Sequence, residues 1–248
     1  MKVSAVIICK NEAHIIGKTI AAAKKCCDDI VIIDSGSTDN TLLIAREHHC
    51  TIIETEWKGY GITKNIGIAA AKNDWILSID ADEVIDETLS REIIALNAPT
   101  EETVFNVQFK VYFNEQRIRF GEWSTDAHIR LFNKNICKWT DAAVHEVLIL
   151  PPNVKLANIN GHILHYTATN EADMMAKAKR YAQLNATKYF EKGKRTNAMM
   201  PILAAAFSFI KNYFFRFGFL DGKAGFIIAK INAYYTWLKY QLLLKIKE

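Results

Sequence analysis

The first hundred residues alternate between continuous apolar runs and stretches with helical spacing of apolar positions. A run that stays apolar throughout is typical of a strand covered on both faces. Such runs occupy residues 3–9, 30–33, 51–54 and 75–79, and helical patterns occupy residues 13–27, 41–49 and 59–72. This alternation predicts an α/β fold with a doubly wound, mostly parallel sheet.

The pattern changes after residue 100. Residues 103–113 and 116–120 predict paired antiparallel strands around Asn114-Glu115, and residues 127–132 predict another strand. Residues 171–248 are mostly helical in pattern, with breaks at Pro201 and at Gly218 and Gly222. We therefore expect one domain over residues 1–170, with halves 1–100 and 101–170. A helical extension over residues 171–248 follows it.

Composition supports a globular protein, because half of the residues are apolar and 23% are charged. The five cysteines show no zinc-binding spacing, so a reducing compartment such as the cytoplasm is expected. The apolar start is short, and Lys10 and Glu12 follow it at once, so it reads as a first strand and not as a signal peptide.

Charge divides the chain unevenly. Residues 1–170 hold 17 basic and 22 acidic side chains, whereas residues 171–248 hold 14 basic and 5 acidic ones. A basic segment rich in aromatic residues could bind nucleic acid or an anionic membrane. An ordinary solvated helical face is the alternative.

Three carboxylates follow the fourth apolar run, in Asp80-Ala81-Asp82-Glu83. They repel one another unless a cation or protons compensate. Oxygen ligands of this kind suit Mg²⁺ or Mn²⁺, which leave positions open for phosphate oxygens. A metal bridging a diphosphate would stabilise charge on a leaving nucleotide. The structural alternative is an acidic helix N-terminus.

Polar clusters also follow the first two strands, at Lys10-Asn11-Glu12 and at residues 34–39. In parallel sheets the ligand lies beyond the carboxyl ends of the strands, so the three clusters should converge on one crevice. Asp34 could accept hydrogen bonds from a base or ribose, while Ser37 or Thr38 could cap the next helix. Neither a Walker lysine loop nor a GxGxxG motif occurs.

Four segments in order, residues 6–12, 34–39, 64–67 and 75–83, resemble the motifs of family-2 glycosyltransferases across about residues 1–150. The resemblance implies an inverting enzyme of GT-A fold that uses a UDP-sugar and a divalent metal. Asp34 and Lys64 would help to hold the nucleotide, beside Glu12 and Asn65 of the same motifs. Asp80 would lie near the ribose, and Asp82 would ligate the metal. Ser35 stands where many members carry a second acid that contacts uracil.

Residues 120–123, 130–133, 144–146 and 218–226 narrow the resemblance. They are similar to a subgroup that includes the lipopolysaccharide-core β-1,4-glucosyltransferases of bacteria, which act on heptose. The subgroup implies glucose as the sugar and a saccharide or lipid-linked saccharide as the acceptor. It also implies a place at the cytoplasmic face of the inner membrane.

Inverting transfer needs a base that deprotonates the acceptor hydroxyl. Glu146 is the first candidate, with Asp141 and Asp126 in reserve, and a surface carboxylate is the alternative for Glu146. Three further residues are acceptor-side candidates. Trp123 could face a sugar ring or be a core aromatic. Arg130 could bind a diphosphate or form a structural ion pair with Glu122 or Asp126. His145 could support Glu146 or ligate the metal.

The apolar run of residues 199–210 is shorter than the roughly 20 residues needed to span a bilayer. Aromatic residues after it alternate with Lys211 and Arg216, a composition that fits a helix lying in an anionic membrane interface. A helical extension packed on the domain or a dimer contact is the alternative.

Two other function classes compete with sugar transfer. A nucleotidyltransferase would share the sheet and the acidic metal site, but it would need a glycine-rich basic loop where Lys10-Asn11-Glu12 stands. A non-enzymatic membrane-binding or nucleic-acid-binding protein would leave the strand-end carboxylates unexplained, since an acidic cleft repels phosphate. We expect no nucleic-acid partner.

Overall fold

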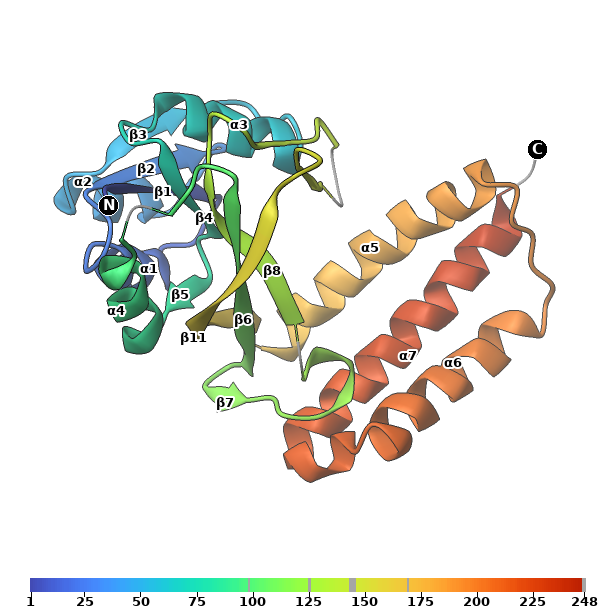
Figure 1. The fold of residues 1–248 in the computed structure, drawn as a ribbon. Helices are drawn as coiled ribbons and strands as arrows, with labels where there is room; N and C mark the ends of the chain where they lie inside the picture. The colour runs from blue at the N-terminus through green and yellow to red at the C-terminus, as the bar shows by residue number, and fades with distance from the viewer. Residues whose placement is uncertain (98, 125, 143–145, 169, 247–248) are drawn as a thin grey trace. The chain divides into compact units, whose positions relative to one another are not determined.

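The computed structural model describes residues 1–97, 99–124, 126–142, 146–168 and 170–246. The chain folds into two compact units (Figure 1). The first unit comprises residues 1–109 and 126–165, and the second comprises residues 110–125 and 166–248. The functional division predicted at residue 170 stays a prediction.

The first unit begins with the alternating strands and helices that the apolar pattern predicts. Its elements are β1 (Val3–Cys9), α1 (Ile16–Ala23), β2 (Asp29–Asp34), α2 (Thr41–Glu47), β3 (Thr51–Glu54), α3 (Tyr60–Ala70), β4 (Trp75–Asp80), β5 (Glu83–Ile85), α4 (Glu87–Ala95), β6 (Thr103–Phe113), β8 (Asp126–Asn133), β9 (Lys138–Trp139), β10 (Leu148–Ile149) and β11 (Lys155–Ala168). The last residues of β6 and β11 belong to the second unit.

Among the described residues the main sheet runs in the order β3-β2-β1-β4-β8-β6-β11-β5. Its first four strands are parallel, and β8 is antiparallel to both β4 and β6. The predicted α/β fold class, with its helical C-terminal extension, is confirmed. The pattern did not reveal β11, because this strand is only partly buried and carries asparagines and histidines among its apolar positions.

Alternating side chains of β1 contribute to both layers of the core. Val3, Ala5 and Ile7 belong to a buried cluster that includes residues of α1 and α4. Val6 and Ile8 belong to a second cluster, which includes residues of α3 and of the β9–β10 hairpin. A parallel sheet covered by helices on both faces explains why β1 is apolar at every position.

The second unit is mainly helical, with α5, α6 and α7 drawn side by side in Figure 1. Its elements are β7 (Gln116–Arg117), a 3₁₀ turn η1 (Gly121–Trp123), α5 (Glu171–Glu191), α6 (Met200–Ile210), a π-helical turn η2 (Lys211–Phe215), a 3₁₀ turn η3 (Gly218–Asp221) and α7 (Gly222–Lys245). The helical prediction is confirmed, although Pro201 lies in the first turn of α6 and does not interrupt a helix. No helix in the described part of the chain is long and apolar enough to cross a membrane.

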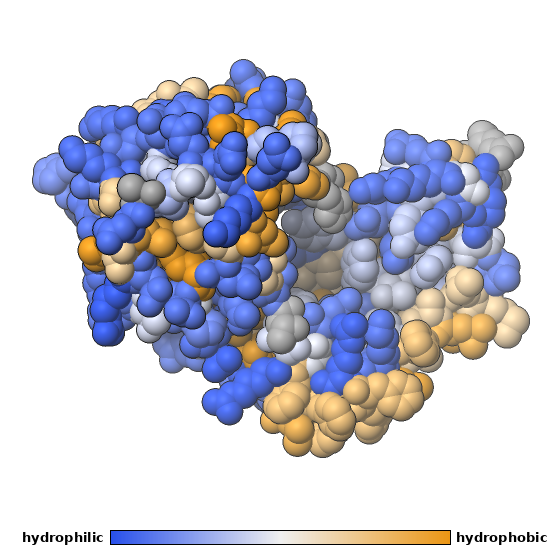
Figure 2. Space-filling view, in the orientation of Figure 1, coloured by the Kyte–Doolittle hydropathy of each residue, from blue (hydrophilic) through white to orange (hydrophobic). Residues whose placement is uncertain are grey.

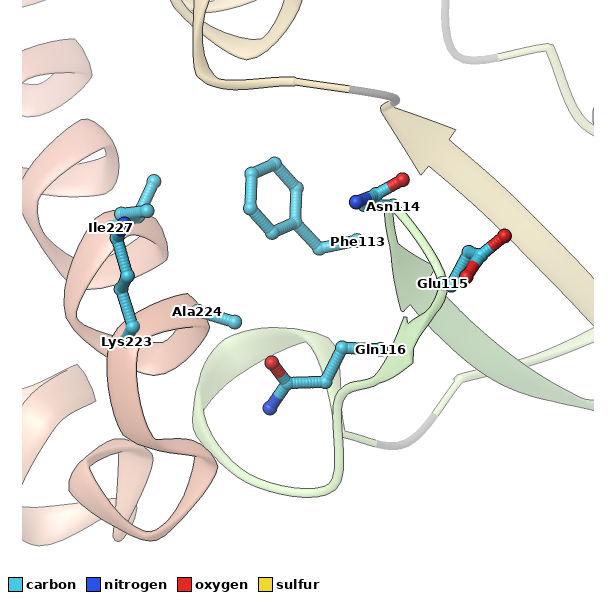
Figure 3. A pocket seen from close by; sticks show the side chains of 7 residues that line it. All are labelled: Phe113, Asn114, Glu115, Gln116, Lys223, Ala224 and Ile227. Atoms are coloured by element: carbon cyan, nitrogen blue, oxygen red, sulfur yellow. The ribbon is translucent and has the colours of Figure 1, made fainter.

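A cavity of about 500 Å³ opens in the second unit, between the turn that joins β6 to β7 and the first turns of α7. Figure 3 shows Phe113 and Gln116 on one side of this cavity and Ala224 and Ile227 on the other. Its lining residues are Phe113, Asn114, Glu115, Gln116, Lys223, Ala224 and Ile227.

Gly67 allows α3 to approach the sheet closely. A Cβ atom at this position would lie 2.5 Å from a methyl carbon of Val6 and 2.7 Å from a side-chain carbon of Ile33. Gly67→Ala should therefore lower the free energy of unfolding by about 2 kcal/mol, measured by urea denaturation.

Gly17→Ala is the matched control. Its added Cβ would meet only Ile44 at 3.3 Å and His48 at 3.9 Å, and alanine favours the helix. Equal destabilisation by the two substitutions would contradict the assigned packing role of Gly67.

Candidate active site

The carboxyl ends of β1, β2 and β4 lie at one edge of the sheet. In the register of the strands, Cys9 pairs with Asp34 and Ile8 pairs with Asp80. The loop that begins at Lys10 therefore starts between the strand ends that carry the two aspartates. The three segments thus start at one edge of the sheet, as the sequence pattern predicts, and their meeting in one crevice stays a prediction.

Lys64 is the centre of this edge. Its side chain is only 2% exposed, and its Nζ lies 2.7 Å from Glu146 Oε1 and 3.3 Å from Asp80 Oδ1. The ammonium also lies 4.9 Å from the ring centroid of Trp139. Residues three and four apart share a face of a helix, so Lys64 lies on the same side of α3 as Gly67 and Ile68, which pack against the sheet. The helix thus directs a buried cation between two carboxylates that are distant in sequence.

A second buried ion pair lies beside the first. Arg130, from β8, places Nη2 at 2.5 Å from Glu83 Oε1 and at 4.0 Å from Asp80 Oδ2. Burial raises the pKa of Glu83 above its usual range, although Arg130 opposes the shift. The structural partner of Arg130 is therefore Glu83, and the predicted pairing with Glu122 or Asp126 is replaced. A contact between Arg130 and a diphosphate stays a prediction.

The surrounding cations control the charge of Asp80. Burial alone would raise the pKa of this carboxyl group, but Lys64, Arg130 and His165 outweigh burial and lower its pKa below the usual range. Within the described residues, the buried atom Arg130 Nε has no hydrogen-bond partner, whereas Asp80 Oδ1 lies 3.3 Å from the Lys64 ammonium. A buried polar atom without a partner is rare in folded proteins and marks a place where a ligand can complete the bonding.

Asp82 faces a histidine that sequence reasoning missed. His165 Nε2, from β11, lies 3.4 Å from Asp82 Oδ2, because β11 pairs with β5 and sets His165 opposite Glu83. Burial lowers the pKa of His165, but the carboxylates of Asp82, Glu83 and Asp80 outweigh it and raise the pKa to about 9. Recognition of β11 as a strand would have been the signal for this residue.

The side chains of Asp82 and His165 carry donor atoms that suit a divalent cation. Carboxylate oxygen suits Mg²⁺ and Mn²⁺, imidazole nitrogen is a common metal ligand, and both side chains are partly exposed. Two protein ligands leave coordination positions for a substrate. Among the described residues, no group of three or more His, Cys, Asp or Glu could hold a metal ion.

Asp34 organises its own loop. Its carboxylate accepts hydrogen bonds from Gly36 N at 2.9 Å, from Ser37 N at 2.8 Å and from the Ser37 hydroxyl. The predicted caps Ser37 and Thr38 are wrong, since α2 begins after Asn40 and has no side-chain cap. Ser37 Oγ accepts a bond from Asn11 N instead, which joins this loop to the one after β1.

A cavity of about 490 Å³ lies beside the Asp34 loop. The exposed ring of Trp57 lines it and meets Tyr60 edge to face, with ring centroids 4.7 Å apart. Trp57 was also missed from the sequence, because it follows β3 in a segment without a recognised motif. The lining residues are Lys10, Asp34, Ser35, Gly36, Glu54, Thr55, Glu56 and Trp57.

Two predicted nucleotide-binding residues have structural contacts. The Glu12 backbone N–H donates to Thr41 Oγ1 at 2.8 Å, which ties the loop after β1 to α2. The Asn65 side chain donates to Trp139 O at 2.9 Å and accepts from Trp139 N at 3.0 Å. Their contacts with a nucleotide stay predictions.

The acceptor-side candidates are dispersed. Asp126 and Asp141 are exposed, and Asp126 Oδ2 lies 2.8 Å from His128 Nε2. Trp123 belongs to the second unit, where it packs against that unit's buried cluster. His145 lies outside the described residues. Among the candidates that the structure describes, Glu146 contacts Lys64 at the edge described above.

Comparison with known proteins decides the family. The model of "Glycosyl transferase family 2" matches residues 4–147, a range that extends from the second residue of β1 through β9 to Glu146 and the residue after it. The chain belongs to glycosyl transferase family 2. The family match ends before His165 and before the helices of the second unit.

Relatives of similar length support this membership. An uncharacterized glycosyltransferase of Rickettsia bellii is 30% identical over all of this chain and 86% of its own length. One from Rickettsia felis is also 30% identical, over all of this chain and 90% of its own length. Because both alignments cover the whole of this chain, the sequence similarity to these relatives extends into the second unit.

Solved structures give only distant matches. Glucosyl-3-phosphoglycerate synthase from Mycobacterium tuberculosis, in complex with Mn²⁺, UDP and glucosyl-3-phosphoglycerate, has a TM-score of 0.35 and 19% identity, covering 46% of this chain and 44% of its own. TarS of S. aureus has a TM-score of 0.47 and 12% identity, covering 93% of this chain and 55% of its own.

Lys64→Met should lower the free energy of unfolding by about 3 kcal/mol, because it leaves Asp80 and Glu146 without their shared buried cation. Urea denaturation at pH 7 measures the change. The double variant Lys64→Met with Glu146→Gln should recover part of the loss. Additive losses in the double variant would contradict the coupling.

The charge on His165 should make stability depend on pH. Its folded pKa of about 9 lies above the ordinary value of 6.5, so protonation stabilises the fold. The stabilisation is complete below pH 6.5 and is lost as the pH rises through 9. The difference in unfolding free energy between wild type and His165→Gln, measured in EDTA, should shrink over that range. His14→Gln, at an exposed histidine, is the control, and a pH-independent difference at His165 would contradict the assignment.

Proposed function

We propose that the chain is an inverting glycosyltransferase that transfers glucose from UDP-glucose to a saccharide acceptor. One observation carries the proposal: Lys64 contacts both Asp80, at a strand end on the donor side, and Glu146, the candidate base. Residues that would serve the two halves of the reaction thus meet at one buried cation. Family membership supplies the reaction class, and this contact favours one assignment of residues within it.

The cavity beside Trp57 is the proposed place for the nucleoside. An exposed indole ring can stack on a base, and Lys10 adds a cation at the same cavity. Asp80 stays partly exposed beside Lys64, and a ribose hydroxyl is a suitable donor to its carboxylate. Lys64 and Arg130 are the cations nearest to Asp80 and would attract a diphosphate there.

Asp82 and His165 are the proposed ligands of Mg²⁺ or Mn²⁺. A divalent cation held by them would stabilise the negative charge of the nucleotide leaving group. The imidazole binds metal only as the neutral base, whereas the raised pKa of His165 keeps it protonated at pH 7. Metal binding should therefore release a proton and become tighter as the pH rises.

Glu146 is the proposed base for the acceptor hydroxyl. Its Oε1 contacts the Lys64 ammonium at 2.7 Å, which fixes the orientation of the carboxylate. The second carboxylate oxygen of Glu146, Oε2, is the atom that we propose accepts the proton of the acceptor hydroxyl. Lys64 would then act as a positioning residue that holds the carboxylate in one orientation.

The proposed acceptor is a sugar of the lipopolysaccharide core or of another envelope glycan, modified at the cytoplasmic face of the inner membrane. Its support is the resemblance of residues 120–123, 130–133, 144–146 and 218–226 to the heptose-directed subgroup. Trp123 and His145 stay predicted acceptor contacts.

Glu146→Gln should lower kcat by at least about 100-fold, since the amide cannot accept the acceptor proton. UDP release from UDP-glucose is measured with Mn²⁺ and a heptose-containing core oligosaccharide, while calorimetry measures UDP-glucose binding, which should change little. Asp141→Asn is the matched control, at the reserve candidate for the base.

Three results would contradict parts of this proposal. Retained activity in Glu146→Gln, or an equal loss in Asp141→Asn, would remove Glu146 as the base. An α-linked product from UDP-α-glucose, seen by NMR, would exclude inversion.

A thermal-shift panel of UDP-, GDP- and dTDP-sugars tests the identity of the donor, because the ligand that binds the folded state most tightly stabilises it most.

A further inference from the structure

The second unit has an exposed apolar surface over α6 and the turn that follows it. We name it the aromatic face and define it as the exposed apolar side chains from Met199 to Phe226. The exposed fraction is 70% at Phe215 and 60% at Phe207. Figure 2 shows hydrophobic residues gathered over this part of the unit. Its most prominent members are Ile202, Phe207, Phe214, Phe215, Phe217 and Leu220.

The fold of the second unit directs these side chains outward. Leu203, Phe207 and Ile210 are spaced by three or four residues and share one exposed side of α6. The opposite side of the helix contains buried Pro201, and Ser208 Oγ lies 3.4 Å from Thr236 Oγ1 of α7. An apolar stripe normally faces a core, so a stripe on the solvent side of an ordered helix indicates a binding surface.

A tightly built turn holds the aromatic face beyond α6. A Cβ atom at Gly225 would lie 1.8 Å from the Gly218 carbonyl oxygen, so the start of α7 touches the turn through backbone alone. The buried Asp221 carboxylate accepts hydrogen bonds from the Arg119 and Phe120 N–H groups. Phe217 has a φ of +57°, which is costly for a bulky side chain. The segment 218–226, singled out in the sequence, is therefore the scaffold that presents this face.

The chemistry around the aromatic face is cationic. Asp221 is the only acidic residue between positions 192 and 247, and it is buried. Lys211, Arg216 and Lys223 lie within or next to the turn. From another segment, the Glu122 carboxylate lies 3.4 Å from Nδ2 of the buried Asn212, on the inner side of the turn. Exposed apolar side chains flanked by cations complement an anionic surface.

The polar content of the face favours lipid over protein. Over residues 214–220 the exposed side chains are four phenylalanines, one leucine and Arg216. A protein interface normally carries a polar rim with several hydrogen bonds, whereas aromatic side chains entering a bilayer need none. A bilayer also needs no matching shape.

We propose that the aromatic face docks on the surface of an anionic phospholipid bilayer. The rings of Phe214, Phe215 and their neighbours enter the boundary between headgroups and acyl chains. Lys211, Arg216 and Lys223 meet the phosphate groups. This proposal does not depend on the sugar or the acceptor of the proposed function.

Co-sedimentation of the full chain with vesicles tests the proposal. The wild type should bind vesicles of equal parts phosphatidylglycerol and phosphatidylcholine about tenfold or more tightly than vesicles of phosphatidylcholine alone. The double variant Phe214→Ser with Phe215→Ser should bind the anionic vesicles about tenfold or more weakly. Lys211→Gln with Arg216→Gln should remove most of the preference for anionic lipid.

The matched control is Leu43→Ser with Leu156→Ser in the first unit, two apolar side chains that are 52% and 60% exposed. It should bind vesicles like the wild type. In every variant, UDP-glucose should raise the melting temperature as much as it does in the wild type. The thermal shift therefore reports on donor binding, and co-sedimentation reports on membrane docking.

Three results would overturn the proposal. The first is a wild type that does not bind anionic vesicles, and the second is equal binding by the phenylalanine variant. The third is a wild type that is dimeric by analytical ultracentrifugation, with a monomeric phenylalanine variant and no vesicle binding. That result would assign the face to a second copy of the chain.

Discussion

The burial of the Lys64 ammonium between Asp80 and Glu146 is the constraint on which the candidate site depends. A charge removed from water must be compensated at short range, and here the compensation comes from β4 and from the segment just before β10. The same requirement extends outward, since Asp80 also lies near Arg130, which pairs with Glu83. Side chains between positions 64 and 146 are thereby held in one arrangement.

The apolar pattern predicted the first unit well where strands are buried on both faces. The bounds of β1 and β3 match the predicted strands, and the strand-end clusters meet because β1 lies between β2 and β4. Strand β11 could not be predicted in this way, since its burial is partial and its composition mixed. Because β11 was not predicted, the sequence did not identify His165, which is the partner of Asp82.

Motif reasoning singled out residues that lie together at the candidate site, but it did not identify their partners. Lys64, Asp80 and Glu146 were all singled out, but spacing in sequence cannot show that one cation joins them. Asn65 and Arg130 illustrate the same limit, because each contacts a protein group in the folded chain. Contacts between distant segments are decided by packing, as at Gly67, and packing leaves little trace in a local pattern.

The Asp34 carboxylate has a consequence for the choice of nucleobase. Its oxygens already accept bonds from Gly36, Ser37 and Cys9, and the next position is Ser35 rather than a second acid. A pyrimidine in the adjoining cavity would then be distinguished chiefly by the fit of its ring against Trp57 and by backbone groups. Discrimination by shape separates closely related bases less sharply than a dedicated hydrogen bond. With the nucleoside in the proposed cavity, selection among pyrimidine bases would therefore be weak.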